Sequence, residues 1–123
     1  MLCNEVIPLK GKNQEINYSG VSPDEIALLD GLKSCGITIL EKTQETVTLK
    51  IFEREISFKI LNKIDFTSER RCATIIVRDN YNRCHLYTKG SDDAIIKRQN
   101  KNSIKEKSDQ ICANVKKFSE EVF

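Results

Sequence analysis

The hydrophobic pattern of this chain changes period at Gly36, and this change constrains the fold more than any other feature. Before it, "SPDEIALLDGLKSCG" has apolar residues at helical spacing. Ser22 is a suitable N-cap, Pro23 suits the first helical position, and Glu25 completes a capping box. The segment predicts a helix over about residues 23–35, which Gly36 ends. Its apolar positions are Ile26, Leu29 and Leu32.

Beyond Gly36, apolar and polar residues alternate with a period of two, which is typical of half-buried strands. "ITILEKT", "TVTLKIF" and "EISFKILNKIDF" predict strands, and the last two form a hairpin around Glu53 and Arg54. "CATIIVRD" and "RCHLYTK" flank "DNYN", which favours a turn, so they predict a second hairpin. The apolar run Ile75, Ile76 and Val77 indicates a central strand covered on both faces. The expected inward residues of the first hairpin are Val47, Leu49 and Ile51, opposite Ile56, Phe58 and Ile60, with Ile64 continuing this set.

The ends of the chain predict helices and loops around this sheet. "MLCNEVIPLK" is a short helix or an extended lead-in, and "KGKNQEINY" is a loop. "GSDDAIIKR" predicts a short helix with Ser91 as N-cap, and "QNKNSIKEK" a mobile loop. A final helix from about residue 105 to the end has an apolar face. The whole, residues 1–123, is one α+β domain with an antiparallel sheet of about five to six strands flanked by helices. The residues of that last helical face are Ile111, Val115, Phe118 and Val122.

Composition excludes several classes of protein. With 39% hydrophobic and 31% charged residues, the chain is a soluble globular one, and no apolar stretch approaches the roughly 20 residues that span a bilayer. A net charge of +2 argues against a nucleic-acid partner. Five widely spaced cysteines and one histidine, His85, make a zinc site improbable and indicate reduced thiols in the cytosol. We expect no metal ligands and no catalytic residues in this chain.

The stretch "DFTSERR" admits two interpretations. Phe66 has the parity of the inward set, so packing in the core is the default for a lone phenylalanine. However, polar residues follow it at once, and an aromatic ring at a sheet edge near Arg70 and Arg71 is suited to stacking a base and neutralising phosphates. The residues alone leave these alternatives open. "VSPDEIALL" and "LYTKGSDDAII" are both explained by helix capping.

Taken together and in this order, four stretches resemble the nucleotide-binding domain of P-type ATPases, in the phospholipid-flippase branch. The pattern of that family runs V-x-P, Y-x-x-x-S-P-D-E-x-A-L, E-F-T-S-x-R-K-R-M-S-V-I-V-R and L-Y-x-K-G-A-D. Here the corresponding stretches are "LCNEVIP", "YSGVSPDEIALL", "DFTSERRCATIIVR" and "LYTKGSDDAII", so the resemblance covers nearly the whole chain.

The resemblance implies a cytosolic domain that binds ATP, with Mg-ATP as the substrate of the parent enzyme. Phe66 would stack the adenine, Glu25 would face its amino edge, and Lys89 would line the pocket floor. Ser68 and Arg71 would lie towards the ribose and phosphates, while Gly90 shapes the site. The implied partners are the phosphorylation and actuator domains of the same parent chain, at the cytoplasmic face of a membrane that only the parent enters.

The chain departs from the family pattern at several positions. Arg71 stands where lysine is usual, Cys72 and Ala73 replace arginine and methionine, and Ser91 replaces alanine. The motif D-K-T-G-T, whose aspartate accepts the phosphoryl group, is absent, and the chain ends before a G-L-R-T-L segment. We therefore expect nucleotide binding without turnover. The alternative is the same fold acting mainly in protein interaction, with weak or lost nucleotide binding.

Overall fold

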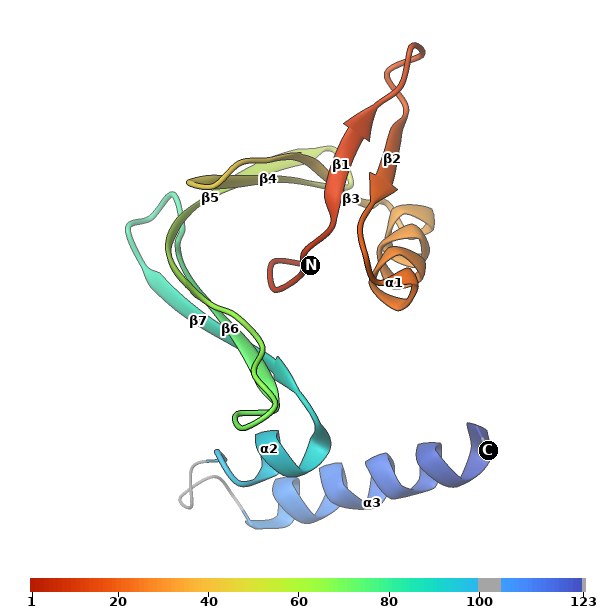
Figure 1. Cartoon of the computed structure of the whole chain (residues 1–123), viewed down its shortest axis with the longest axis vertical. Coiled ribbons are helices and arrows are strands. Elements are labelled where there is room, and N and C mark those ends of the chain that lie inside the picture. Colours follow the sequence, from red (N-terminus) through yellow and green to blue (C-terminus); the bar gives the residue numbers. More distant parts are fainter. Residues whose placement is uncertain (100–104, 123) are drawn as a thin grey trace.

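The computed structural model describes residues 1–99 and 105–122, and its main feature is a curved antiparallel sheet (Figure 1). Its strand order is β3-β4-β5-β6-β7, so every strand pairs with its neighbour in sequence. This confirms the α+β class and the two hairpins that the period of two predicts. The strands are β3 (Ile37–Lys42), β4 (Thr46–Ile51), β5 (Arg54–Ile64), β6 (Cys72–Arg78) and β7 (Cys84–Gly90).

A second, two-stranded sheet precedes the large one in sequence. It pairs β1 (Ile7–Lys10) with β2 (Ile16–Ser19), and helix α1 (Pro23–Ser34) follows it. The prediction of a loop over "KGKNQEINY" is therefore wrong for Ile16, Asn17 and Tyr18. Their polar neighbours gave this short strand no clear alternating pattern. Figure 1 shows α1 on the concave side of the large sheet and the two short strands at its β3 end. Helices α2 (Asp92–Ile96) and α3 (Lys105–Val122) follow β7.

Helix α1 begins at the Ser22 cap and ends before Gly36 as its sequence predicts, but the Glu25 carboxylate accepts from the Glu5 amide and from Lys89 instead of completing a capping box. The Ser22 hydroxyl accepts a hydrogen bond from the Glu25 amide at 3.3 Å, and Gly36 has a φ of 85°, which glycine adopts without steric cost. Ser91 caps α2 in the same way, accepting from the Ala94 amide at 3.4 Å. Capping therefore fixes the position of Glu25 in the first turn of α1, where the candidate site lies.

The core lies between the concave face of the large sheet and the N-terminal elements. Ile39 and Val47 from the sheet pack there against Val6 and Leu29, and all four side chains are buried. In β6, Ile75 and Val77 are also buried, but Ile76 on the other face is only half-buried. The expectation that this strand is covered on both faces is therefore only partly correct. Its place inside the sheet is as predicted, since β6 pairs with β5 on one side and with β7 on the other.

A bulge in β5 reverses which residues face the core. Ile60 pairs with Val77, but the register then shifts, so that Lys63 pairs with Ile75 and Ile64 with Thr74. Since directly opposed residues share a face of the sheet, Lys63 takes the concave face and Ile64 the outer one. The prediction that Ile64 continues the inward set is wrong for this reason, and its side chain is 42% exposed.

The first hairpin turns one residue earlier than expected. Ile51 pairs with Arg54, so the turn is formed by Phe52 and Glu53, and Phe52 has a φ of 54°. The two apolar sets still oppose each other, but each pair is shifted: Val47 lies opposite Phe58 and Leu49 opposite Ile56, whereas a turn at Glu53 and Arg54 would oppose Val47 to Ile60 and Leu49 to Phe58. Ile60 lies beyond the β4 pairing, where its amide donates to the Glu45 carbonyl at 2.6 Å.

The predicted apolar face of the last helix is present on α3 but exposed. Ile111, Val115 and Phe118 are 48%, 38% and 61% exposed, respectively. The side chain of Val122 and most of the expected "QNKNSIKEK" loop lie outside the described residues. In the described parts of the chain, no helix combines the length and hydropathy needed to span a bilayer.

Asp79 fixes the turn between β6 and β7. Its Oδ1 accepts from the Tyr81 and Arg83 amides, both at 2.9 Å. Its Oδ2 accepts from Arg83 Nε at 2.8 Å and lies 2.9 Å from His85 Nε2. The hydrogen bond with His85, followed by those with Arg83 and Tyr81, holds the pKa of the Asp79 carboxyl well below its usual range.

We expect Asp79→Asn to lower the Tm at neutral pH, because an amide cannot accept all of these bonds as a carboxylate does. The pKa of Asp79 is depressed in the folded state. Its stabilisation is therefore present above the ordinary aspartate pKa of about 3.9 and is lost as the pH falls towards the folded-state value. The Tm difference from wild type should thus shrink under acid, which circular dichroism melts over a pH series measure. A difference that does not change with pH, or an equal one for the exposed Asp30→Asn, would contradict this role.

Candidate functional site

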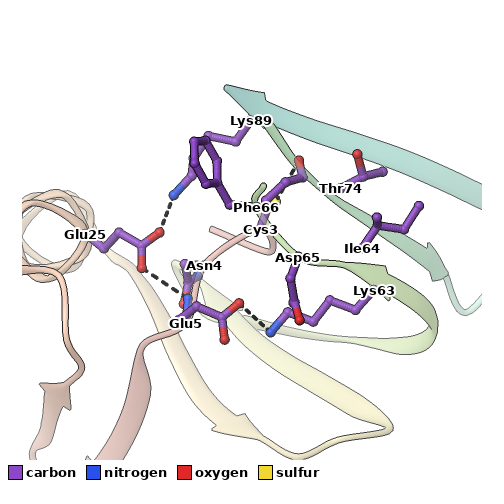
Figure 2. Close-up of a pocket in the computed structure, with 11 residues that line it drawn as sticks. Cys3, Asn4, Glu5, Glu25, Lys63, Ile64, Asp65, Phe66, Thr74 and Lys89 are labelled. Atoms are coloured by element: carbon purple, nitrogen blue, oxygen red, sulfur yellow. Dashed lines mark hydrogen bonds and ion pairs between the residues drawn. The ribbon is translucent and has the colours of Figure 1, made fainter. Parts of the chain in front are cut away.

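A pocket of about 430 Å³ lies where the concave face of the sheet meets the N-terminal elements (Figure 2). Residues 1–6, which we call the N-terminal strap, form one wall through Cys3, Asn4 and Glu5. The first turn of α1 adds Glu25. The ends of β5, β6 and β7 form the rest, with Lys63, Ile64, Asp65, Phe66, Ala73, Thr74 and Lys89. Segments far apart in the sequence therefore converge on one cavity.

Phe66 lies just past the end of β5 and lines this pocket rather than the core. Its side chain is 61% exposed. Of the two interpretations of "DFTSERR", the structure excludes packing in the core. An exposed aromatic ring beside a cavity offers a flat apolar face for stacking.

Glu25 and Lys89 form an ion pair across the pocket, between α1 and β7 (Figure 2). The Glu25 side chain is 16% exposed, and its other carboxylate oxygen accepts from the Glu5 amide at 3.1 Å. Burial alone would raise the pKa of Glu25, but the bonds from Lys89 and Glu5 and the charge of Lys89 outweigh it and lower the pKa. Glu25 is therefore an ionised acceptor held in a fixed place.

A second ion pair bounds the pocket on the β5 side. Lys63 Nζ lies 2.6 Å from Glu5 Oε1, and both residues line the cavity. The sequence did not single out Lys63, because simple alternation puts it on the outer face of β5. The β5 bulge turns it inward, and a bulge of this kind leaves no clear mark in the sequence.

Arg71 and Ser68 do not line the pocket in this structure. Ser68 is exposed in the loop that joins β5 to β6. Arg71 has a φ of 54°, and its guanidinium lies 3.8 Å from Asp93 Oδ2 at the start of α2. Its carbonyl accepts from the Ser91 amide at 3.1 Å. The structure thus brings Glu25, Phe66 and Lys89 together and leaves the two residues expected near the phosphates outside the cavity.

Gly90 closes the end of the β6–β7 ladder, where it pairs with Cys72. A Cβ atom placed on Gly90 would lie 2.5 Å from both the Arg71 carbonyl oxygen and Cys72 Cβ. Cys72 itself is fully buried. Gly90 therefore allows the close approach of the two strands beside Lys89, and it is not among the residues that line the pocket.

The fold and these residues match a known family of proteins. Residues 1–121 match the family model described as the cytoplasmic domain N of P-type ATPases. The chain therefore belongs to the P-type ATPases, as their cytoplasmic domain N.

Curated relatives refine the comparison. The chain is 31% identical over 118 residues to the phospholipid-transporting ATPase dnf1 of Schizosaccharomyces pombe, covering 89% of this chain and 8% of the relative. It is 37% identical over 97 residues to the phospholipid-transporting ATPase IC of Xenopus tropicalis, covering 79% and 8%. For tat-1 of Caenorhabditis elegans, also named a phospholipid-transporting ATPase, the identity is 33% over 112 residues, covering 90% and 10%. The chain thus spans about a tenth or less of the length of these relatives.

Proposed function

We propose that this chain binds ATP in the pocket between the strap, α1 and the ends of β5 and β7. The observation that carries the proposal is the convergence of Glu25, Phe66 and Lys89 on one cavity. In this arrangement Phe66 stacks the adenine, and the ionised Glu25 accepts from its amino edge. Lys89 lines the floor as a donor, and Gly90 lets β6 and β7 approach closely enough to place it. Stacking of a base on an aromatic ring is worth about 1–3 kcal/mol.

The phosphates are expected to extend from the pocket towards Ser68 and Arg71. The Arg71 side chain is 56% exposed, and its contact with Asp93 at 3.8 Å is a long one. A surface ion pair of this kind contributes little, so the guanidinium is available to a phosphate at small cost. The Mg²⁺ ion would arrive with the nucleotide, held by its phosphates.

In the parent protein we propose that this domain holds Mg-ATP for phosphoryl transfer to an aspartate in a separate phosphorylation domain. The names of the relatives support a phospholipid-translocating ATPase as that parent. The domain would then lie at the cytoplasmic face of the membrane, beside the phosphorylation and actuator domains of the same chain. Alone it should bind nucleotide without turnover.

The alternative function is protein interaction, with weak or lost nucleotide affinity. Two observations favour it. Both lysines of the pocket are already paired with carboxylates, and Cys72, which stands where the family usually has arginine, is fully buried. A phosphate therefore has to compete with Glu5 or Glu25 for a cation, unless it reaches Arg71.

Calorimetric titration with Mg-ATP tests the proposal. We expect a dissociation constant near millimolar or somewhat tighter, equivalent to about −4 to −5 kcal/mol, because stacking and a single well-placed carboxylate supply most of the affinity. Mg-GTP, which presents an oxygen where adenine presents an amino group, should bind more weakly. Absence of ATP binding at concentrations well above millimolar would favour the protein-interaction alternative. Tighter binding of a single-stranded oligonucleotide would contradict both.

A further inference from the structure

The N-terminal strap has to hold a defined conformation for the pocket to exist. Leu2 and Val6, at its two ends, are buried in the core. Between these anchors, Cys3, Asn4 and Glu5 line the cavity. The strap forms no helix or strand, so its own backbone does not fix these residues.

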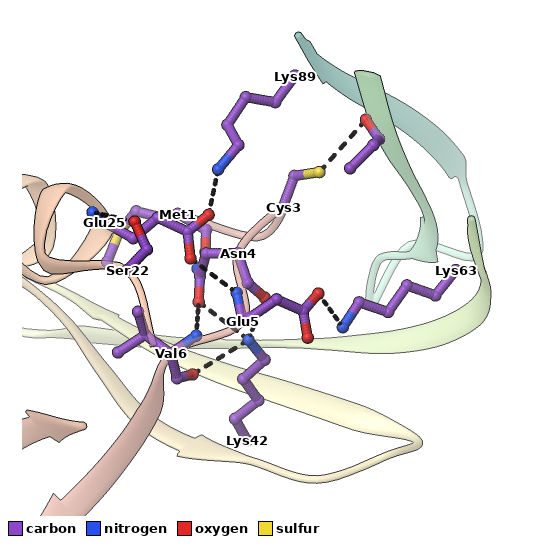
Figure 3. A network of polar contacts seen from close by, with 11 residues as sticks. Met1, Cys3, Asn4, Glu5, Val6, Ser22, Glu25, Lys42, Lys63 and Lys89 are labelled. Carbon is purple, nitrogen blue, oxygen red and sulfur yellow. Dashed lines mark hydrogen bonds and ion pairs between the residues drawn. The ribbon is translucent and has the colours of Figure 1, made fainter. Parts of the chain in front are cut away.

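Lys42, the last residue of β3, is hydrogen-bonded to the strap (Figure 3). Its ammonium donates to the Asn4 carbonyl at 2.6 Å, to Asn4 Oδ1 at 2.9 Å and to the Val6 carbonyl at 3.1 Å. These three bonds use the full donor capacity of an ammonium group. Asn4 Oδ1 also accepts from the Val6 amide at 2.9 Å, and Asn4 Nδ2 donates to the Met1 carbonyl. Lys42 and Asn4 together therefore set the path of the strap between its two anchors.

A bulge in β3 turns the Lys42 side chain towards the strap, as the bulge in β5 does for Lys63. In β3 the register shifts between Ile39 and Glu41, so that Lys42 pairs with the buried Val47. Without the shift, Lys42 would face outward and Glu41 would face the core. Bulges are frequent next to functional sites, where they re-aim a side chain. Both bulges of this sheet turn a lysine towards the same strap.

The strap contacts the residues proposed to bind the nucleotide, so its position affects theirs. Its Glu5 amide donates to Glu25, and its Glu5 carboxylate holds Lys63. Glu25 in turn holds Lys89. Moving the strap therefore removes one bond from Glu25 and the counter-ion from Lys63 at the same time.

We propose that Lys42 is a positioning residue of the nucleotide pocket. By donating hydrogen bonds to Asn4 and Val6, it fixes the strap so that the Glu5 amide donates to Glu25. The inference rests on the proposed function for the identity of the ligand. Lys42 itself is not among the residues that line the pocket. The effect on affinity is transmitted through the strap.

The test compares three variants of the full chain. Lys42→Met keeps the length of the stem and removes all donors, Lys42→Arg keeps the charge and donors, and Lys50→Met is the control, since Lys50 pairs with Glu53 away from the pocket. Amide hydrogen exchange of Glu5 and Val6 is followed by NMR without ligand, and Mg-ATP affinity is measured below the melting temperature of each variant. If Lys42→Met fails to fold, Lys42→Gln, which retains one donating amide, replaces it in the comparison.

We expect Lys42→Met to exchange the Val6 amide about tenfold faster and to bind Mg-ATP about five- to tenfold more weakly, the factors expected when net hydrogen bonds to a charged group are lost. Lys42→Arg should keep the Val6 exchange rate and the Mg-ATP affinity close to those of wild type. Lys50→Met should change neither quantity. Unchanged exchange and affinity in Lys42→Met would overturn the inference, as would equal losses in Lys50→Met. If wild type binds no nucleotide, the proposed function fails, and the exchange rates of Glu5 and Val6 alone decide whether Lys42 positions the strap.

Discussion

Phe66→Ala should weaken Mg-ATP binding by about 1–3 kcal/mol, or roughly five- to 150-fold, while leaving the fold intact. The loss follows from the removal of the ring on which the adenine stacks. The fold should survive because the side chain is 61% exposed and packs outside the core. Titration calorimetry gives the affinity, and a circular dichroism melt shows whether the Tm is retained.

Phe118→Ala is the matched control for this variant. Phe118 on α3 is also 61% exposed, but it does not line the pocket. The two substitutions therefore remove the same ring at the same exposure, and only the first should alter ATP affinity. Equal affinities of wild type and Phe66→Ala would show that the stacking assignment is wrong.

Gly90→Ala should lower the free energy of unfolding by about 1–3 kcal/mol, the range for forcing an extra carbon into a tightly packed site. Alanine is ordinarily better than glycine inside a strand by roughly 0.5–1 kcal/mol. Here the added Cβ would lie 2.5 Å from the Arg71 carbonyl oxygen and from Cys72 Cβ, so β6 and β7 must separate. We also expect weaker Mg-ATP binding, because Lys89 and Arg71 adjoin the disturbed pair. Urea unfolding followed by circular dichroism measures the change.

Gly31→Ala provides a control of opposite sign. Gly31 lies in α1, and a Cβ placed there meets no atom within 4 Å. This variant should be stabilised by up to about 1 kcal/mol, since glycine is a poor helix former. If Gly90→Ala behaved like Gly31→Ala, the close approach of β6 and β7 would not exist in solution.

The sequence predicted the elements that depend on local chemistry. The cap at Ser22 and the glycine stop at Gly36 placed α1 to within a residue of its end. The "DNYN" turn and the period of two placed the second hairpin. These features are local, because a cap or a turn is decided by residues that are near neighbours in the chain.

The parts that the sequence missed depend on pairing between distant residues. Simple alternation placed Ile64 on the inward face and gave Lys42 and Lys63 no role. Bulges in β3 and β5 move these three residues to the opposite face of the sheet. The strand at Ile16 was missed because four polar-rich residues stabilise a pair only through their partner strand. The same limit applies to the site. Phe66 was ambiguous from the residues until the structure showed where β5 ends.

For Ser68 and Arg71, the role in phosphate binding stays a prediction. Both residues lie outside the cavity that Glu25, Phe66 and Lys89 line, so the structure brings together only the residues proposed to hold the adenine. The backbone of Arg71 is in the left-handed region, which costs a non-glycine residue about 1–2 kcal/mol. Gln14, Phe52 and Asn82 adopt the same backbone conformation in other turns, so at Arg71 it is explained by the turn alone.

The most direct test of the central claim is an NMR titration of the isotopically labelled chain with Mg-ATP. If ATP binds with its adenine on Phe66, the largest shifts should fall on the backbone amides of Glu25, Phe66 and Lys89 and should saturate near millimolar concentration. A second hollow of about 530 Å³, lined by Arg54, Tyr81 and His85 among others, provides an internal comparison. Shifts centred on that hollow, or no shifts at Glu25, Phe66 and Lys89, would contradict the proposed nucleotide site.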